Sequence, residues 1–363
     1  MSDDFETLLV GGLPEESEAD SLHILDEYGV KPVLIPEMQR NPNFFSDRKA
    51  LKKIKEIIRE FEPDIVHTHA AKAGALGRKA ASDCKVPVIV HTFHGHVFHS
   101  YFSKYKTELY RQIEKRLASR STGIIAISDI QKHELSSVFR IAPAKKIEVI
   151  PLGFDLNPFQ ENISEKRKTT RENYQLANDQ IAVAIVGRLA PIKNHDLFLK
   201  AAKITQKKTS QKLVFFIVGD GELRADIETK ISTLKAEFNI DIRMTSWIKD
   251  IKTFNAGMDV ICLTSNNEGT PVSLIEAQAC NIPIVSTNVG GVMDIVDEGQ
   301  TGYVVPKDDA EAFAEKLLLI TEDEKNRERL SQNGWSFVKN KFHYTRLVSD
   351  VENYYRKLLS QKK

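Results

Sequence analysis

Short runs of apolar and β-branched residues alternate with helical patterns along nearly the whole chain of 363 residues. This alternation is typical of parallel sheets whose strands are joined by helices packed on their faces. The pattern is interrupted near residue 156 and then restarts, and the chain is long enough for two domains with separate cores. The sequence therefore predicts an α/β protein of two Rossmann-like domains. A ligand would bind at the carboxyl ends of the strands, in a cleft where the two sheets face each other.

The expected elements fall into two series. In the first, strands are predicted at 6–10, 64–69, 86–92, 123–128 and 147–152, and helices at 47–60, 73–82, 104–118 and 129–135. In the second, strands are predicted at 182–187, 213–219, 241–244, 259–264 and 282–287, and helices at 195–205, 223–236, 248–255 and 272–280. Polar helical segments at 310–320 and 347–359 follow.

The interruption contains Pro151, Gly153 and Pro158, followed by the polar tract 160–171 with little apolar content. Proline, glycine and polar residues in this order favour a linker. We therefore expect an N-terminal domain over 1–155, a linker over 156–175 and a C-terminal domain over 176–345. The remaining residues, 346–363, would form a helix that returns to the N-terminal domain.

The charge of the chain is unevenly distributed. Residues 1–30 hold 9 Asp and Glu and no Lys or Arg, whereas residues 31–150 hold 22 Lys and Arg against 12 Asp and Glu. One interpretation is that the basic segments 48–59 and 104–120 are the solvated faces of amphipathic helices. The other is that they meet an anionic membrane surface or a phosphorylated acceptor. Nucleic acid is not expected, because no binding module accompanies the basic residues.

Cysteine content and hydropathy indicate the cellular setting. Cys84, Cys262 and Cys280 form neither a disulfide framework nor a paired zinc spacing. No segment approaches the roughly 18 apolar residues needed to span a bilayer, and the acidic N-terminus has no signal-peptide pattern. We expect a cytoplasmic protein that contacts the inner face of the cell membrane peripherally.

The segment Glu268-Gly-Thr-Pro-Val-Ser-Leu-Ile-Glu276 follows a predicted strand and opens a predicted helix. Thr270 is suited to the N-cap and Pro271 to the first helical position, and the start of such a helix favours a phosphate. Glu276 can accept hydrogen bonds from two vicinal hydroxyls, such as those of a ribose. A phosphate-binding helix end between two carboxylates suits a nucleotide sugar. Taken alone, the same spacing is typical of carboxylates on a solvated helix edge.

A second set of residues follows the first strand of the C-terminal series. Gly187 permits a tight turn, Arg188 can hold a diphosphate with two hydrogen bonds, and Lys193 adds a point charge. These cations would stabilise a departing nucleoside diphosphate without a metal ion, and no Asp-x-Asp pattern at a strand end suggests one. Gly219 marks another tight turn that can approach the nucleotide, although such turns occur in most doubly wound sheets.

Several segments of the C-terminal half resemble glycosyltransferase family 4, retaining enzymes of the GT-B fold. They are IVGRLAPIKN (185–194), FIVGDGEL (216–223), SNNEGTPVSLIEAQAC (265–280), PIVSTNVGGVMDIV (283–296) and GQTGYVV (299–305). The resemblance implies that Arg188 and Lys193 contact the donor diphosphate, Glu276 the ribose and Glu268 the transferred sugar. The turn at Trp247 and Ile248 would lie beside the base. The expected donor-binding residues are Gly187, Arg188, Lys193, Gly219, Trp247, Ile248, Glu268, Gly269, Thr270, Pro271 and Glu276.

PDIVHTHAAKAGALGRKAA (63–81) and VPVIVHTFHGHVFHSYFS (86–103) in the first half also resemble this family. The comparison assigns to His94 a hydrogen bond to the donor sugar and its β-phosphate, so the implied catalytic residues are His94, Glu268, Arg188 and Lys193. His96 is a candidate acceptor contact. His94, His96 and His99 raise the possibility of zinc, but no cysteine or acidic cluster completes a site, and no metal is predicted. His67 and His69 suit the core as well as a functional role.

The start of the chain departs from the family pattern. Members usually begin with a strand and a glycine-rich loop, whereas here Gly11 and Gly12 follow a predicted strand and precede an acidic loop, which fits the second strand of the family better. We therefore expect the first strand and its loop to be missing. Their loss would leave unpaired backbone groups and a thinner core.

These observations predict a retaining hexosyltransferase with a UDP- or GDP-linked donor and no cofactor beyond this co-substrate. The acceptor would be a glycan or lipid-linked saccharide in cell-surface polysaccharide synthesis. No carboxylate is placed as a nucleophile beneath the sugar, which favours a front-side path in which the leaving phosphate helps to deprotonate the acceptor. One alternative is an epimerase of UDP-N-acetylglucosamine with the same architecture, which would need acid-base carboxylates. The other is a non-catalytic nucleotide-sugar binder.

Overall fold

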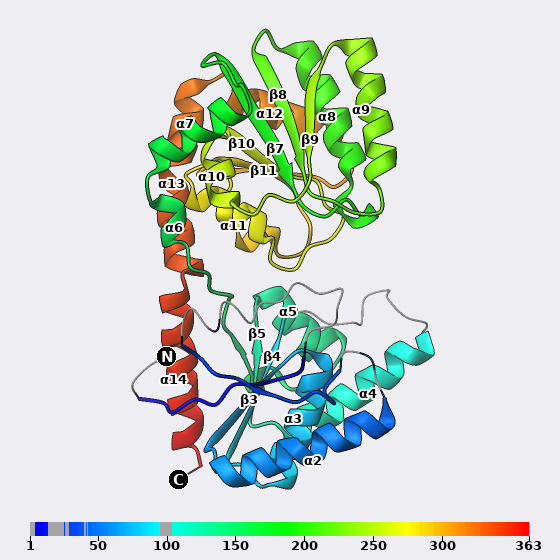
Figure 1. Cartoon of the computed structure of the whole chain (residues 1–363), viewed down its shortest axis with the longest axis vertical. Coiled ribbons are helices and arrows are strands. Elements are labelled where there is room, and N and C mark those ends of the chain that lie inside the picture. Colours follow the sequence, from blue (N-terminus) through cyan, green and yellow to red (C-terminus); the bar gives the residue numbers. More distant parts are fainter. Residues whose placement is uncertain are drawn as a thin grey trace. The chain divides into compact units, whose positions relative to one another are not determined.

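The computed structural model describes residues 4–13, 25, 29–39, 41, 43–94 and 104–362, and the chain forms two compact units (Figure 1). The first unit comprises residues 1–150 and 350–363, and the second comprises residues 151–349. The helix α14 (Tyr344–Ser360) begins in the second unit and ends in the first. Parallel strands joined by helices make up both units, which confirms the predicted α/β class.

The first unit contains a four-stranded parallel sheet in the order β3-β4-β5-β6. These strands are β3 (Ile65–His69), β4 (Val88–Phe93), β5 (Gly123–Ala126) and β6 (Ile147–Val149). The accompanying helices are α2 (Phe44–Phe61), α3 (Ala71–Asp83), α4 (Lys104–Arg120) and α5 (Asp129–His133), with a π-helix at Glu134–Val138 and a 3₁₀-helix at Ala144–Lys146. The inner strand β4 is buried over all six residues, including the polar His91 and Thr92.

The predicted strand at 6–10 is much shorter in the structure. Only Val10–Gly11 (β1) pairs, with Val33–Leu34 (β2), and these two strands form a separate parallel sheet. The apolar run before Val10 is partly exposed, because Leu9 retains 42% of its accessible surface. Apolar content alone therefore predicted a longer strand than the structure contains.

The second unit contains a six-stranded parallel sheet in the order β12-β11-β10-β7-β8-β9. The strands are β7 (Gln180–Val186), β8 (Lys212–Val218), β9 (Asp241–Thr245), β10 (Val260–Leu263), β11 (Ile284–Thr287) and β12 (Gly302–Val305). The helices are α6 (Asn157–Gln160), α7 (Ile163–Asn173), α8 (His195–Lys208), α9 (Arg224–Phe238), α10 (Ile251–Ala256), α11 (Val272–Ala279), α12 (Ala310–Thr321) and α13 (Glu324–Phe342). 3₁₀-helices lie at Pro191–Lys193 and Gly290–Asp294.

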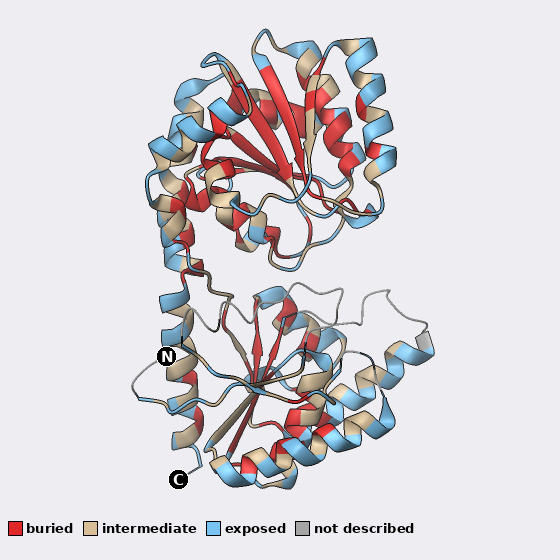
Figure 2. Ribbon diagram, in the orientation of Figure 1, coloured by how far each residue is buried: buried red, intermediate tan, exposed pale blue. Residues whose placement is uncertain are grey.

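Two apolar cores lie on opposite faces of this sheet, and the strands between them are mostly buried (Figure 2). Successive strand residues point to opposite faces, so Ala182 and Ala184 of β7 belong to one core, whereas Val183 and Ile185 belong to the other. The helices α10, α11 and α13 cover the first core, and α8, α9 and α12 cover the second. Both faces are therefore closed to water, and the loops at the strand ends are left to bind ligands.

The polar tract predicted as a linker is helical. It forms α6 and α7, and α7 packs beside α10 within the second unit. Its basic residues bind Asp259 at the start of β10: Arg167 Nη2 donates to Oδ1 at 2.7 Å and Arg171 Nη1 to Oδ2 at 3.3 Å. The backbone N–H of Ala182 also donates to Asp259 Oδ2, at 2.8 Å. The charged residues of the predicted linker thus attach α7 to the start of β10.

Replacing Asp259 by alanine should destabilise the second unit by about 2 kcal/mol, because two arginines and a buried strand amide lose their common acceptor. Asp179→Ala is the matched control, since its ion pair with Lys212 is mostly exposed on both sides and such pairs contribute about 0–1 kcal/mol. Urea unfolding followed by circular dichroism measures both. Equal midpoints for the two variants would contradict the role given to Asp259.

Candidate functional site

The topology of the second sheet places a site at the carboxyl ends of β7 and β10. From β7 the chain proceeds outward to β8 and β9, and it then returns to β10 on the other side of β7. Ligands of doubly wound sheets bind where the strand order reverses in this way. The loops after β7 and β10 touch at this point, since the Asn266 amide donates to Ile192 O at 2.7 Å and Thr264 Oγ1 to Lys193 O at 3.0 Å.

The loop after β7 carries both predicted diphosphate-binding cations. Arg188 is exposed, and Lys193 ends a 3₁₀-helix with a half-buried side chain. The turn at Gly187 packs backbone to backbone against Gly219 of the next loop, where a Cβ would lie 2.0 Å from Gly187 O and φ is +144°. Only glycine fits at residue 219, so this residue sets the path of the β7 loop rather than contributing a side chain.

Glu268 is held by two donors. Lys193 Nζ lies 2.6 Å from Glu268 Oε1, and Ser265 Oγ donates to the same oxygen at 2.5 Å. Ser265 is fully buried at the end of β10, and Thr287 Oγ1 of the neighbouring strand donates to its carbonyl at 2.8 Å. The structure thus places Lys193 and Glu268, two of the predicted site residues, in direct contact, and it adds Ser265. No sequence pattern singles out Ser265, because its contact with Glu268 depends on how the chain leaves β10.

Two glycines, Gly290 and Gly291, pack closely against the backbone of the loop that carries Glu268 and Gly269. At Gly290 a Cβ would lie 1.8 Å from Glu268 O, and at Gly291 it would lie 2.1 Å from Gly269 O. The Gly291 amide also donates to Glu268 O at 3.3 Å. This close backbone packing fixes the start of the loop leading into α11.

The helix α11 begins at Val272, in agreement with the predicted range 272–280, but its capping residue differs from the prediction. Its N-cap is Pro271, with φ −71° and ψ 96°, and no side chain caps the helix. The prediction of Thr270 as the capping residue was therefore wrong: proline already has extended backbone at this position, and the helix starts at Val272. The amino end of α11 still follows directly on Gly269 and Thr270, where backbone N–H groups and the helix dipole favour an anion.

Glu276 lies inside α11, and its side chain is half-buried. Burial raises the pKa of this carboxyl to about 7. A carboxylate kept in this environment lacks the hydration that would stabilise its charge. Donor hydroxyls would supply hydrogen bonds in place of that hydration.

The loops after β8 and β9 lie beside each other. Ser246 Oγ donates to Asp220 Oδ2 at 3.0 Å, and Arg224 Nη1 lies 3.1 Å from the same oxygen. Trp247 is 58% exposed, whereas Ile248 packs against the apolar core. Of the two residues expected near the base, Trp247 offers the accessible aromatic surface.

In the first unit, histidines gather at the ends of β3 and β4. His69 Nδ1 lies 2.9 Å from His94 Nε2 with the two rings stacked, and the His67 ring lies 4.3 Å from the His69 ring. His67 is itself held by Tyr355 of α14 at 2.5 Å and by Thr92 at 2.7 Å. Burial lowers the pKa of His94, and it lowers the pKa of His69 to about 4. Both shifts favour the neutral form of the ring at physiological pH. The predicted residues His96 and His99 lie outside the described part of the chain.

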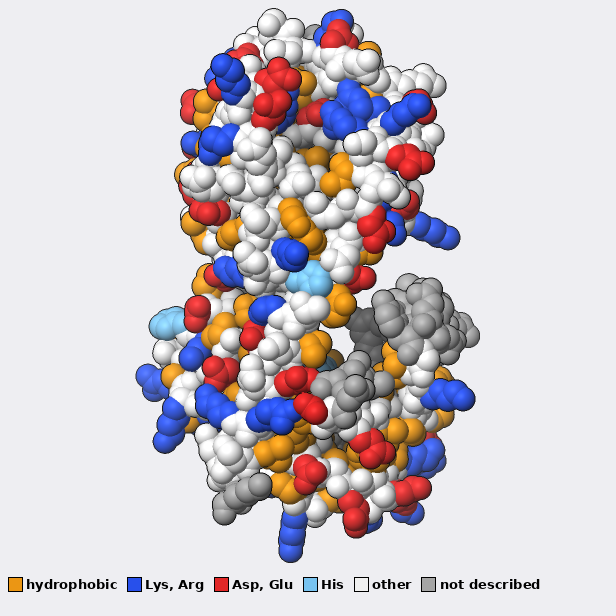
Figure 3. All heavy atoms as spheres, turned by 90° about the vertical axis from the view of Figure 1, so that its left-hand side faces the viewer, with side chains coloured by type: hydrophobic (Ala, Val, Ile, Leu, Met, Phe, Trp, Pro, Cys, Tyr) orange, Lys and Arg blue, Asp and Glu red, His pale blue; other side chains and the backbone are white. Residues whose placement is uncertain are grey.

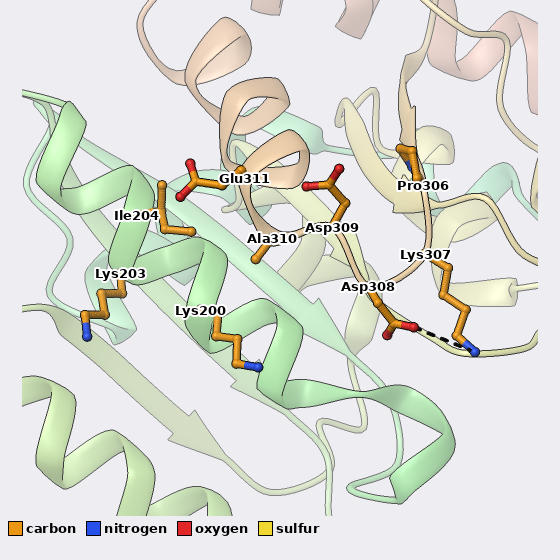
Figure 4. Close-up of a pocket in the computed structure, with 9 residues that line it drawn as sticks. All are labelled: Lys200, Lys203, Ile204, Pro306, Lys307, Asp308, Asp309, Ala310 and Glu311. Carbon is orange, nitrogen blue, oxygen red and sulfur yellow. Dashed lines mark ion pairs between the residues drawn. The ribbon is translucent and has the colours of Figure 1, made fainter.

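Two other features of the structure bear on ligand binding. Among the described residues, no group of three His, Cys, Asp or Glu side chains is arranged to hold a metal ion. A cavity of about 620 Å³ lies beside α8 and the start of α12 (Figure 4). Lysines and carboxylates both line this cavity, including Lys200, Lys203, Asp309 and Glu311. Such mixed charge does not favour an anionic ligand.

Models of known protein families match both units of the chain. The family model of glycosyl transferases group 1 matches residues 166–336, and that of Glycosyltransferase Family 4 matches residues 7–158. An Escherichia coli UDP-Gal:alpha-D-GlcNAc-diphosphoundecaprenol alpha-1,3-galactosyltransferase is 32% identical, over 90% of this chain and 84% of the relative. The chain belongs to glycosyltransferase family 4.

Other relatives of this glycosyltransferase extend the comparison. The capsular polysaccharide biosynthesis glycosyltransferase CapM of Staphylococcus aureus is 29% identical, over 93% of this chain and 88% of CapM. The crystal structure of Anabaena Alr3699/HepE in complex with UDP superposes with a TM-score of 0.80 at 18% identity, covering 97% of this chain and all of that one. A Rickettsia africae glycosyltransferase structure gives a TM-score of 0.77 at 22% identity, covering 93% and 87% of the two chains. The predicted GT-B fold is confirmed. Within the described residues, no helix is both long and apolar enough to cross a membrane.

Proposed function

We propose that this glycosyltransferase transfers a hexose-type sugar, with retention, from a UDP- or GDP-linked donor to a lipid-linked or polysaccharide acceptor in cell-surface synthesis. The observation that carries the proposal is the contact of Lys193 with Glu268 at the reversal point of the second sheet, directly before the helix that contains Glu276. A cation for the diphosphate and carboxylates for sugar and ribose hydroxyls are the groups that a nucleotide sugar needs.

The relatives support the choice of substrates. The Escherichia coli relative is named for a UDP-galactose donor and a diphosphoundecaprenol-linked acceptor, and a Campylobacter jejuni relative for an undecaprenol-linked acceptor. The HepE structures contain UDP or UDP-glucose. A UDP-sugar is therefore the first donor to test. An acceptor on a lipid carrier would place the enzyme at the cytoplasmic face of the membrane as a peripheral protein.

In the proposed reaction, the bond between the anomeric carbon and the β-phosphate oxygen breaks while a bond to the acceptor oxygen forms on the same face. The acceptor proton passes to the departing phosphate oxygen. Arg188, Lys193 and the amino end of α11 stabilise the charge that develops on that phosphate, which is the part of the transition state that differs most from the bound substrate. These groups supply the positive charge themselves, so the proposal includes no resident metal.

We propose that His94 hydrogen-bonds the donor sugar and that His69 positions it. The contact between His69 Nδ1 and His94 Nε2 restricts which His94 nitrogen carries the proton. The neutral ring expected at physiological pH suits a hydrogen-bond partner rather than a counter-ion. A ring held through one nitrogen can present the other to substrate.

The test is NMR of UDP-glucose, UDP-galactose and GDP-mannose, each incubated with the enzyme with and without an undecaprenyl diphosphate-linked saccharide. The proposal predicts sugar transfer and nucleoside diphosphate release that require acceptor, with an anomeric coupling constant that matches the donor. Conversion of the donor without acceptor would identify an epimerase instead. Binding of a donor without turnover across the acceptor panel would identify a non-catalytic binder.

Replacing Ser265 by alanine should lower kcat about 3–10-fold with a smaller change in KM. Glu268 would lose one of its two donors and with it part of its fixed orientation. Steady-state transfer kinetics check this expectation. Ser232→Ala on α9 is the matched control, because its hydroxyl bonds only the preceding helical turn. Unchanged kinetics in Ser265→Ala would remove Ser265 from the site.

A further inference from the structure

A series of contacts in the first unit connects the helix α14 with His94. Tyr355 Oη of α14 lies 2.5 Å from His67 Nδ1, and the centroid of the His67 ring lies 4.3 Å from that of the His69 ring. His69 Nδ1 in turn lies 2.9 Å from His94 Nε2, with the two rings stacked. A residue from the last helix of the chain is thereby linked to the histidine proposed to bind the donor sugar.

The His67 ring is held at both of its nitrogens. Thr92 Oγ1 lies 2.7 Å from Nε2, while Tyr355 contacts Nδ1. A neutral imidazole has one N–H and one acceptor nitrogen, and a hydroxyl can serve either. Burial raises the pKa of Tyr355 to about 12 and lowers the pKa of His67 to about 3. These shifts favour the neutral forms, so the contact is a hydrogen bond rather than an ion pair.

The strand that carries His67 is held from its other face. Successive strand residues point to opposite faces, so Thr68 of β3 points away from His67, and its Oγ1 lies 2.9 Å from Nδ1 of the buried His91. A Cβ at Gly74 of α3 would lie 2.5 Å from His91 Cε1. A Cβ at Gly77 would lie 2.7 Å from Thr68 Cγ2. Such close packing leaves β3 little room to shift, so the direction of the His67 ring depends on its hydroxyl partners.

His69 and His94, by contrast, are exposed to solvent. Exposed side chains change rotamer rapidly, so a histidine that presents one nitrogen to a sugar needs contacts that select its rotamer and tautomer. In the described part of the chain, the His69 ring contacts His67 on one side and His94 on the other. The orientation fixed at His67 therefore reaches His94 through His69.

The charged residues that follow Tyr355 on α14 form surface ion pairs. Arg356 Nη2 lies 2.5 Å from Asp4 Oδ2, and both side chains are exposed. Lys357 Nζ lies 2.9 Å from Glu148 Oε2, again with both side chains exposed. Figure 3 shows the molecule from the side on which α14 lies in Figure 1, and basic and acidic side chains are interspersed there. Exposed pairs contribute little, so the hydroxyl of Tyr355 is the contact of this turn that bears on the histidines.

We propose that Tyr355 is a positioning residue for sugar transfer. Its hydroxyl fixes the His67 ring, His67 orients His69, and His69 determines which nitrogen His94 presents to the donor sugar. The inference deepens the proposed function and rests on it for the role of His94, whereas the series of contacts is a property of the unliganded enzyme.

Tyr355→Phe removes the hydroxyl and keeps the ring, and NMR of the unliganded full chain with ¹⁵N-labelled histidine detects the result. Long-range ¹H–¹⁵N spectra report the tautomer and protonation of each imidazole, and single replacements of His67, His69 and His94 by glutamine assign the signals. We expect the signals of all three rings to shift in Tyr355→Phe. Because neither donor nor acceptor is present, this result does not depend on the proposed transfer reaction.

Tyr354→Phe is the matched control. Tyr354 precedes Tyr355 on α14 and is buried, and burial also raises the pKa of its hydroxyl to about 12. This hydroxyl lies against the start of β5 instead, since a Cβ at Gly123 would be 2.2 Å from Tyr354 Oη. Its loss should lower the melting temperature to a similar extent and leave the three histidine signals unchanged. Shifts at His69 and His94 in both variants alike, or in neither, would overturn the proposal.

Thr92→Val tests the same ring from β4 and takes the place of Tyr355→Phe if that variant does not fold. It removes the other hydroxyl partner of His67 and keeps the branched shape of the side chain. The signals of His69 and His94 should shift here as well, and unchanged signals would refute transmission through His67.

Steady-state kinetics test the consequence for the reaction. Tyr355→Phe should lower kcat about 5–10-fold with little change in KM for the donor, whereas Tyr354→Phe should keep kcat within about twofold. In the His94→Ala background, Tyr355→Phe should cost nothing further, because residues that act through one another are not additive. An undiminished loss in that background would overturn the proposal. Absence of transfer by the natural enzyme would instead refute the proposed function and leave the NMR result standing.

Discussion

Replacing Arg188 by alanine is expected to lower kcat/KM for sugar transfer by about two to three orders of magnitude, and Lys193→Ala should have an effect of similar size. A preorganised hydrogen-bond donor that lies where charge develops in the transition state contributes on this scale. Arg188 is exposed on the loop after β7 and is positioned by the close packing of Gly187 on Gly219. Both variants should lose kcat, because the departing phosphate carries more charge than the bound donor.

The two cations should differ in a second respect. Lys193 is bound to Glu268 in the unliganded enzyme, so its loss also frees the carboxylate expected to contact the sugar, and Lys193→Ala should raise KM for the donor as well as lower kcat. Arg188→Lys should recover less than a tenth of the lost activity, because an ammonium cannot form the two parallel hydrogen bonds of a guanidinium.

Lys200→Ala is the matched control for these variants. Lys200 is an exposed lysine of the same unit that lines the separate cavity of Figure 4, and its loss should leave kcat/KM within about twofold. Steady-state release of nucleoside diphosphate measures all four variants. Arg188→Ala and Lys193→Ala with kinetics like those of Lys200→Ala would refute the assignment of the diphosphate site.

The strands and helices of the second unit could be predicted because the positions of their apolar residues indicate which side of each element is buried. Strands β7 and β8 are continuous apolar runs, and both are covered on their two faces. The helix α13 was missed for the opposite reason. Its buried residues Leu330, Gly334, Val338 and Phe342 lie four apart in an otherwise polar helix, and so narrow a stripe gives a weak periodic signal.

The candidate site was predictable where a residue's role follows from its own chemistry and local spacing. Lys193 and Glu268 are 75 residues apart in sequence, and each was predicted separately from its own loop; their contact follows from the pairing of β7 with β10, which the structure shows. Ser265 and the glycine at 290 could not be assigned in this way. Their roles arise from the distance between neighbouring loops, which depends on tertiary packing rather than on sequence pattern.

Replacing Glu276 by glutamine should weaken UDP binding about 30-fold or more at pH 8, while it stabilises the unliganded enzyme. The ribose hydroxyls would lose hydrogen bonds to a charged acceptor, which contribute about 1.5–3 kcal/mol each. Isothermal titration calorimetry with UDP and 2′-deoxy-UDP provides the measurement. The natural enzyme should prefer UDP, and the variant should lose most of this preference. If the donor is GDP-linked, calorimetry with GDP and 2′-deoxy-GDP provides the same measurement.

The stability change follows from the raised pKa of Glu276, from 4.5 to about 7. Between these values the folded state holds a proton that the unfolded state has released, so this residue lowers the free energy of unfolding as pH rises from about 4.5 to 7, and the full penalty is present above pH 7. Glutamine removes the penalty, which corresponds to roughly 2–3 kcal/mol. The melting temperature of Glu276→Gln should therefore exceed that of the natural enzyme by several degrees at pH 8, and the difference should vanish near pH 4.5.

Binding and stability are linked through the same proton. Because the ribose requires the ionised carboxylate, UDP affinity of the natural enzyme should fall about tenfold per pH unit below pH 7, and binding at pH 6.5 should release protons to the buffer. Calorimetry in two buffers of different ionisation enthalpy counts those protons. In Glu276→Gln the part of the pH dependence and of the proton release that comes from Glu276 should disappear, which leaves only the part that the terminal phosphate of UDP contributes. A variant that melts like the natural enzyme at pH 8 and releases as many protons on binding UDP would assign the titrating group to a different residue.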